Sequence, residues 1–471
     1  MARAAKPKTS LWLPPERRVD VSAVDRTRPP PSRPTPPPAT PEFHETILSG
    51  GFRVRVAAVP KLPEVAIRLM VDGGAAVESA EDAGVAALTT KVLPAGAAGR
   101  TAMQMAEWLD QLGASIGSGV GHDSARFSLH TLSDTCEEAL DYLASIVLAP
   151  SFLPEEVTRV RAERLDEVRR SGDEPGELAS EALSEAVFGD HPYGRPVRGR
   201  VETLETMDSA RLRRFWESSY EAGSSFLVAA GDVDPEAFVA LVERSFGAWA
   251  SGDGRSAAVS HPGPVSSAGS VTLVDRPGSQ QSEIRIGAVG LARGDEDEIP
   301  VLVMNAILGG LFSSRINLNL REDKGWTYGA RSGFSMRRAP GPFVASAAVD
   351  TAVTARAFEE MLSEIRSMTE RPPSEEELAL ARNALILSLP RQFETTSQVA
   401  SKEAERVAYD LPPDWWTRFP ARVEKVGRDD VVRMAERYLD PAGLVMVAVG
   451  EADALRADLA AFGTVEERPT P

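Results

Sequence analysis

The sequence has little of what a disulfide-bonded fold or a metal centre requires. Its 471 residues include one cysteine, Cys136, and five histidines. A single cysteine excludes an intramolecular disulfide and any zinc site built from several thiolates. The five histidines are scattered, and no two of them lie three or four residues apart, at His44, His122, His130, His191 and His261. No helical face therefore carries two imidazoles.

Positive charge is also scarce, and long apolar runs are missing. The formal net charge is −17, which argues against nucleic acid or an anionic membrane as the main partner. No apolar run approaches the roughly 18 residues of a membrane span, and no apolar segment follows the basic start of the chain. With 42% hydrophobic and 26% charged residues, we expect a globular, cytoplasmic protein of several domains.

The first 41 residues differ from the rest in composition. They contain eleven prolines, and eight basic residues against three acidic ones. Proline fixes φ and removes a backbone donor, so this segment is typical of an extended, polyproline-like arm. Two interpretations stay open: a docking arm for an acidic surface, or a solvated leader with no role.

The rest of the chain has the pattern of a mixed fold that occurs twice. Segments such as 125–132 alternate as strands do, and segments such as 136–148 have the helical period. The small polar segment 251–270 is typical of a linker. Matching positions in the two halves keep a shift of 219, 219 and 220 residues, for Met207 with Val426, Gly231 with Gly450, and Glu155 with Glu375.

We therefore predict an α+β protein with two homologous, duplicated domains, each an antiparallel-rich sheet packed against helices. The predicted parts are a proline-rich basic tail at 1–41, an N-terminal domain at 42–250, a linker at 251–270, a C-terminal domain at 271–464 and a tail at 465–471.

Three motifs then carry a resemblance to a known family. They are Phe188-Gly-Asp-His-Pro-Tyr-Gly-Arg-Pro, Asp173-Glu-Pro and Leu308-Gly-Gly-Leu-Phe-Ser-Ser-Arg-Ile. Together with the duplication, they resemble the pitrilysin-type zinc metallopeptidases (inverzincins), which include the mitochondrial processing peptidase. The resemblance implies a clam-shell arrangement of the two domains.

In that family, an H-x-x-E-H helix and a distant glutamate bind zinc and activate water. The matching helix here is expected at 84–93, where Ala87 and Lys91 stand at the histidine positions and Thr90 at the glutamate position. Alanine has no ligand atom, a threonine hydroxyl is no base near neutral pH, and an ammonium repels a cation. Glu167 matches the distant glutamate ligand. One carboxylate alone does not hold zinc, and the alternative interpretation is that Glu167 is an ordinary exposed acid on a helix.

The second half keeps a pair that the family uses on its substrate. Arg321 and Tyr328 match the R-x6-Y pair, which in active members reaches the substrate carbonyl near the zinc. A guanidinium and a phenol can stabilise an oxyanion. Spacing alone favours a surface arginine and a strand anchor, and the resemblance shifts the interpretation towards function. Gly309-Gly310 nearby either leaves room for a peptide backbone or caps the preceding helix.

The resemblance implies the non-zinc subunit of a heterodimeric metallopeptidase, with no enzyme activity alone. A homologous partner subunit with H-x-x-E-H would supply the zinc, this chain would hold no cofactor, and the substrate would be an unfolded peptide. Two alternatives remain: a non-catalytic scaffold in which Arg321 and Tyr328 are relics, and a peptide-binding pseudo-peptidase that acts alone or as a homodimer.

Overall fold

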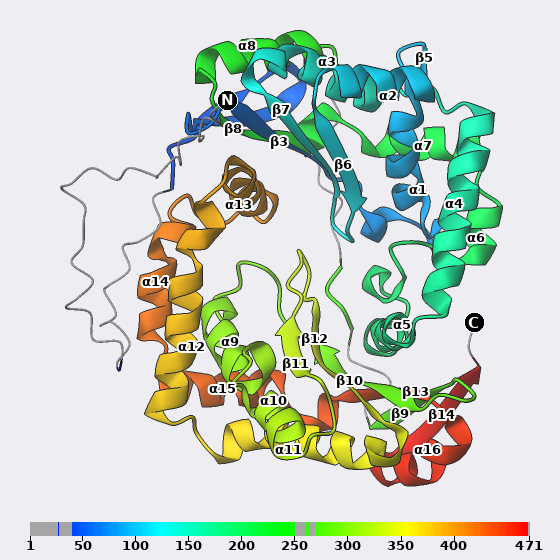
Figure 1. The fold of residues 1–471 in the computed structure, drawn as a ribbon, viewed down its shortest axis with the longest axis vertical. Helices are drawn as coiled ribbons and strands as arrows, with labels where there is room; N and C mark the ends of the chain where they lie inside the picture. The colour runs from blue at the N-terminus through cyan, green and yellow to red at the C-terminus, as the bar shows by residue number, and fades with distance from the viewer. Residues whose placement is uncertain (1–26, 28–39, 250–259, 264–268, 470–471) are drawn as a thin grey trace, which may run out of the picture. The chain divides into compact units, whose positions relative to one another are not determined.

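The structure is a computed structural model that describes residues 27, 40–249, 260–263 and 269–469. By its internal contacts the chain divides into two compact units, Met1–Pro36 and Pro37–Pro471, and all elements below belong to the second (Figure 1). Nearly all of the predicted proline-rich tail and most of the predicted linker lie outside the described residues.

The first half forms a six-stranded mixed sheet in the order β1-β2-β8-β3-β7-β6. Neighbouring strands are antiparallel except β2 and β8, which are parallel. The strands are β1 His44–Ile47, β2 Arg53–Ala58, β3 Glu64–Val71, β6 Ser115–Val120, β7 Ala125–Leu132 and β8 Ser225–Gly231. A separate short hairpin joins β4 Gly96–Ala97 and β5 Arg100–Thr101.

The second half forms a matching sheet in the order β11-β12-β10-β13-β9-β14. Its first four strands pair antiparallel, and β13 and β9 pair parallel, as β8 and β2 do in the first sheet. The strands are β9 Ser270–Asp275, β10 Gln281–Val289, β11 Ala330–Phe334, β12 Pro342–Asp350, β13 Val445–Gly450 and β14 Thr464–Pro469. The predicted α+β fold with two duplicated halves is confirmed.

The two sheets differ at one edge. In the first sheet, β1 precedes β2 in the chain and pairs with it antiparallel. In the second, β14 comes from the far end of the chain and pairs with β9 in parallel. The sequence predicts a tail from residue 465, whereas the structure has most of that segment in β14. Val465 is the only large apolar residue in this strand, so its composition gives little sign of pairing.

Helices cover one face of each sheet. In the first half, α1, α3 and α8 contact the strands. In the second half, α9, α11 and α16 do so. The first-half helices are α1 Val85–Val92, α2 Ala102–Gln111, α3 Cys136–Leu148, α4 Pro154–Gly172, α5 Pro175–Phe188, α6 Val201–Glu205, α7 Ser209–Ser219 and α8 Pro235–Phe246. The second-half helices are α9 Glu298–Asn305, α10 Arg315–Asn317, α11 Thr354–Glu370, α12 Glu375–Ser388, α13 Thr396–Ala408, α14 Trp415–Lys425, α15 Arg428–Tyr438 and α16 Ala452–Leu459.

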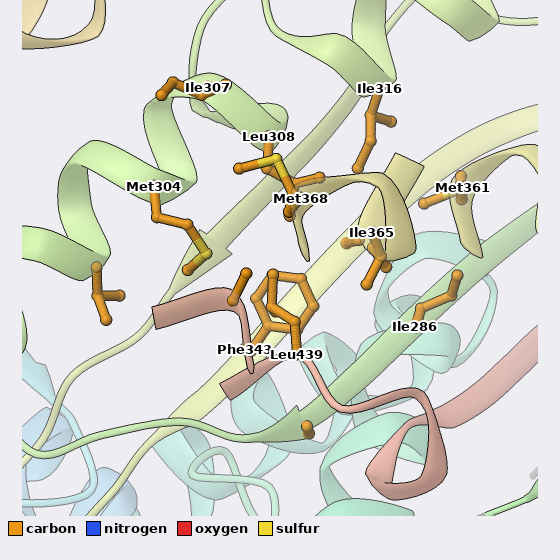
Figure 2. Close-up of a cluster of buried hydrophobic side chains, with 14 of the residues drawn as sticks. Ile286, Met304, Ile307, Leu308, Ile316, Phe343, Met361, Ile365, Met368 and Leu439 are labelled. Carbon is orange, nitrogen blue, oxygen red and sulfur yellow. The ribbon is translucent and has the colours of Figure 1, made fainter. Parts of the chain in front are cut away.

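The core of the second half shows how these helices bury the sheet. Figure 2 shows Phe343 of β12 and Ile286 of β10 beneath methionine, isoleucine and leucine side chains from the helices and their ends. These include Met304 of α9 and Ile365 and Met368 of α11. Each such side chain contributes about 1.5–3 kcal/mol by leaving water.

The opposite face of each sheet is covered by a helix from the other half (Figure 1). The first-half helix α5 packs on β10 and β13, where Leu178 and Leu183 meet Val445 and Val447. The second-half helix α13 packs on β3 and β8 through small residues such as Ala400. We call α5 and α13 the exchanged helices. Because of them β8 and β13 are buried on both faces, which explains their continuous apolar sequences.

One helical stretch is long and apolar enough to cross a membrane. Residues Glu298–Asp323, which run from α9 into the turns after it, have a mean hydropathy of 1.5 in their most apolar window. In this structure 56% of that window is buried, as it is in the core helix of a folded domain.

We predict that the exchanged helices make the two halves unfold together. Leu183→Ala should lower the free energy of unfolding by about 2–5 kcal/mol, because Leu183 is 2% exposed and packs on the sheet of the other half. Urea unfolding followed by circular dichroism measures this. The matched control is Leu380→Ala on α12, where the side chain is 48% exposed and the change should stay within about 0.5 kcal/mol. Two separate transitions in the wild type would contradict the prediction.

Candidate functional site

The helix at the family's metal position is α1, and a glycine contact sets where it begins. Gly84 precedes it with φ 95°, a conformation that favours glycine. A Cβ on Gly84 would lie 2.6 Å from the Cα of Gly199. Gly199 follows closely on the His-Pro-Tyr-Gly-Arg-Pro motif, so this motif and the start of α1 are packed backbone to backbone.

A buried carboxylate caps α1. Glu78 is 6% exposed and accepts hydrogen bonds from the backbone N–H groups of Gly84 at 2.9 Å and Ala86 at 2.7 Å. A carboxylate at this end of a helix satisfies free N–H groups and matches the helix dipole. Burial nevertheless raises the pKa of Glu78 to about 7, against the opposing effect of these two hydrogen bonds.

The structure brings together two of the positions that the family resemblance singles out. The ammonium of Lys91 on α1 donates a hydrogen bond to the carboxylate of Glu167 on α4. Glu163 lies one turn away on α4, 3.9 Å from the same nitrogen. Burial acts to raise the pKa of Glu167, but the hydrogen bond from Lys91 and the charge of Arg164 hold that pKa below its usual range. An ion pair thus joins two positions at which the family resemblance implies metal ligands.

The other two positions are closed as well. Ala87 is 5% exposed and offers no ligand atom. Thr90 is 1% exposed, and its hydroxyl shares a 2.9 Å hydrogen bond with the hydroxyl of Tyr220. With an ammonium on the remaining carboxylate, these residues do not fit zinc.

No alternative metal site appears among the residues that the structure describes, where no group of three or more His, Cys, Asp or Glu side chains could hold an ion. Two of the histidines have other partners. His130 Nε2 lies 3.2 Å from Glu64, and His191 Nδ1 accepts a hydrogen bond from the backbone of Tyr193 at 3.1 Å.

The Arg/Tyr pair lies on the second half and is largely exposed. Arg321 is in the π-helical turn Leu318–Asp323, and its guanidinium stacks 4.7 Å from the ring centroid of Phe312. Its only ion pair among the described residues is a 3.4 Å contact with the neighbouring Glu322. Tyr328 sits between Thr327 and Gly329, which form a small turn, and it is 92% exposed. We call Phe312, Arg321 and Tyr328 the Arg/Tyr surface.

Gly309 and Gly310 pack tightly beside this surface. A Cβ on Gly309 would lie 2.4 Å from the backbone nitrogen of Ser332 on β11, and one on Gly310 would lie 3.0 Å from the carbonyl oxygen of Asn305. Gly309 lets the end of the α9 stretch approach β11, and Gly310 packs against the backbone of Asn305 in that stretch. Among the described residues, no hydrogen bond, ion pair or ring contact joins Arg321 or Tyr328 to Lys91 or Glu167.

Sequence reasoning missed a contact that ties the two halves together. The hydroxyl of Tyr193, in the His-Pro-Tyr motif, donates to Asp123 at 2.6 Å and accepts from the backbone of Ala339 at 3.2 Å. Asp123 also accepts from the backbone N–H of Arg338 at 3.0 Å, and the Arg338 side chain pairs with Asp72. The motif marks Tyr193 in the sequence, but nothing marks Asp123, because its partners are 70 and 215 positions away.

Family models match most of the chain. Residues 53–200 match the model of insulinase (peptidase family M16), and residues 206–385 match the model of the peptidase M16 inactive domain. The chain is 26% identical over 399 residues to an uncharacterized zinc protease of Rickettsia felis, covering 84% of this chain and 94% of that protein. It is 29% identical over 304 residues to an uncharacterized zinc protease of Mycobacterium bovis, covering 64% and 69%.

Solved structures agree with this assignment. A peptidase M16 inactive domain from Pseudomonas fluorescens is similar with a TM-score of 0.82 and 25% identity, covering 87% of this chain and 98% of that one. A protease from Helicobacter pylori shares the fold with a TM-score of 0.80 and 16% identity, covering 87% and 99%.

We predict that three substitutions rebuild a zinc site. The triple variant Ala87→His, Thr90→Glu and Lys91→His places the family's ligands on α1, and the carboxylate of Glu167 already reaches position 91. The purified variant should retain about one zinc per chain after dialysis, by plasma mass spectrometry, whereas the wild type retains none. Adding Glu167→Gln to the triple variant should lower its zinc affinity by tenfold or more. Equal zinc content with and without Glu167 would contradict its position as a ligand.

We also predict that Glu78 makes stability fall as pH rises. Its pKa is about 7 in the folded chain and 4.5 as the ordinary value, so the folded state binds the proton more tightly. The free energy of unfolding should therefore decrease from about pH 5 to pH 8, by up to about 3 kcal/mol from this group. Urea unfolding across this range measures the slope, and Glu78→Gln should make it flatter. An unchanged slope in that variant would show that other groups cause it.

Proposed function

Because the chain belongs to the M16 family of pitrilysin- and insulinase-type peptidases, and resembles its inactive subunits, we propose that it is the non-zinc subunit of a heterodimeric peptidase. A homologous partner would supply the zinc site. This chain would supply peptide-binding surface and the Arg/Tyr surface. On its own it would cleave no peptide.

One observation carries this proposal: the residues at the family's metal positions do not fit zinc, whereas the Arg/Tyr surface is accessible. The metal positions are filled by Ala87, Thr90 and the Lys91–Glu167 ion pair. Tyr328, in contrast, is 92% exposed, and Arg321 keeps 39% of its side chain exposed. Both groups are therefore accessible to a substrate.

The chemistry of the Arg/Tyr surface suits the oxyanion of a peptide-bond cleavage. The guanidinium of Arg321 carries a permanent charge and several donors, and the hydroxyl of Tyr328 adds one more. Two such donors aimed at a developing oxyanion each contribute about 2.7–4 kcal/mol in enzymes where this has been measured. This chain's part in the reaction would be to orient the scissile carbonyl and stabilise its negative charge.

A second candidate is a peptide-binding pseudo-peptidase that needs no zinc-bearing partner. A cavity of about 910 Å³ between the first sheet and α13 supports it, since this volume can hold several peptide side chains.

The heterodimer proposal predicts which residues matter for turnover. Mixing the chain with a zinc-bearing M16 partner from the same genome should restore hydrolysis of a quenched fluorescent peptide. In that mixture, Arg321→Ala and Tyr328→Phe should each lower kcat by about 10²–10³-fold, with a smaller effect on KM, because the donors act on the transition state.

The matched control is Arg366→Ala, an exposed arginine on α11 that should leave kcat unchanged. Full activity of the Arg321 and Tyr328 variants in a working mixture would exclude the oxyanion role. A partner that is equally active without this chain would exclude the heterodimer.

A further inference from the structure

The duplication places two arginines at matching positions beneath the exchanged helices. Arg68 lies in β3 and Arg285 in β10. Each donates to the carbonyl of the preceding residue at 3.0 Å. Each also donates to a backbone carbonyl near the start of an exchanged helix at 3.3 Å, Arg68 to Ser397 and Arg285 to Gly176. The two guanidiniums therefore anchor α13 and α5 in the same way.

Their electrostatic surroundings differ. Arg285 forms a 2.7 Å ion pair with Glu283, two residues earlier in the same strand. The matching position before Arg68 is Ala66. Arg68 is 7% exposed, and no described carboxylate forms an ion pair with it. Its guanidinium also donates to the hydroxyls of Ser397 and Ser401, the latter at 3.0 Å, but these groups are neutral and leave the buried charge without a counter-charge.

A second arginine adds to this positive charge. Arg126 of β7 lines the same cavity, and no ion pair or hydrogen bond of its side chain is present among the described residues. Burial lowers the pKa of Arg68, and the nearby charge of Arg126 lowers it further. The two arginines are thus close enough to repel each other.

The cavity that both arginines line has a volume of about 910 Å³, and both polar and apolar side chains line it. Hydroxyl groups of Ser128, Ser397 and Ser401 line it, and Ser128 lies directly opposite Arg68 in the sheet. Arg293 and Lys402 also reach it, but both are paired with Glu405, at 2.5 and 2.9 Å.

The matching cavity beneath α5 has the opposite character. Its volume is about 630 Å³, and three carboxylates line it against two arginines, at Glu174, Glu177, Glu283, Arg285 and Arg331. In the cavity beneath α5 the carboxylates outnumber the arginines, whereas in the cavity beneath α13 neither Arg68 nor Arg126 has an ion pair among the described residues.

We propose that the cavity beneath α13 binds a carboxylate of an acidic peptide segment, through Arg68 and Arg126. Two guanidiniums without counter-charges balance one or two carboxylates. The exposed fork of Arg126, whose side chain has no hydrogen bond among the described residues, fits a carboxylate with two parallel hydrogen bonds, and the buried Arg68 adds its charge. The inference rests on the proposed function, since it takes the ligand to be a peptide. It adds a preference for negative charge in the peptide. This preference comes from the two arginines in the cavity, since the net charge of the whole protein is −17.

Binding of three labelled peptides to the full chain tests this. They share a fluorescein-labelled Gly-Ser frame and carry Asp-Asp, Asn-Asn or Lys-Lys at the centre. By fluorescence anisotropy, the Asp-Asp peptide should bind about tenfold more tightly than the Asn-Asn peptide at low salt, and the preference should shrink as salt rises. The Lys-Lys peptide should bind most weakly.

Two variants remove the preference without disturbing the anchor of α13. Arg126→Gln removes the exposed arginine, and Ser128→Asp places an internal carboxylate opposite Arg68. In both, the ratio of Asp-Asp to Asn-Asn affinity should fall below about twofold. The matched controls, Ser128→Asn and Arg331→Gln in the opposite cavity, should keep the tenfold ratio. Circular dichroism checks that each variant is folded.

The outcomes separate the two proposals. Equal binding of the Asp-Asp and Asn-Asn peptides, or an unchanged ratio in the two test variants, would overturn the acidic preference and leave peptide binding intact. Binding of none of the three peptides would overturn peptide binding by this chain and the inference with it. Inorganic phosphate that displaces the Asp-Asp peptide at the peptide's own concentration would show a site for small anions instead, which also overturns the inference.

Discussion

The exchange of α5 and α13 between the two halves is the constraint on which the rest of the structure depends. Each sheet buries one face with helices of its own half and the other face with a helix of the opposite half. Without that helix, the strand Val445–Gly450 would expose a continuous row of apolar side chains to water. The Tyr193–Asp123 contact with the loop before β12 adds a polar link between the same halves. Each half therefore depends on the other to bury one face of its sheet.

The position of α1 does not depend on a bound metal. α1 is held by its glycine contact with Gly199, by its cap Glu78 and by burial of nearly all its side chains, none of which requires a metal. The ion pair between Lys91 and Glu167 is 30% and 39% exposed, so it stabilises the chain by no more than about 1 kcal/mol. The ion pair therefore adds little to the stability of the fold.

Much of the fold could be predicted from periodicity. The helix Cys136–Leu148 and the strand Ala125–Leu132 have the predicted bounds, and the constant shift of about 219 residues revealed the duplication. The hydrophobic periodicity of the sequence did not predict α13. This helix packs on its sheet through alanines and one valine, so it lacks a strong apolar stripe. The uncompensated charge of Arg68 was equally hidden, since an ion pair can be recognised as missing only when the neighbours in space are known.

The contact between Gly84 and Gly199 has a consequence for how such chains are recognised. The His-Pro-Tyr-Gly-Arg-Pro segment and Gly199, three residues after it, have two tasks of packing in this protein: Tyr193 links the two halves, and Gly199 contacts the start of α1. Neither task needs a metal. In this chain the motif therefore marks the fold, and the residues at positions 87, 90 and 91 are the ones that bear on zinc binding.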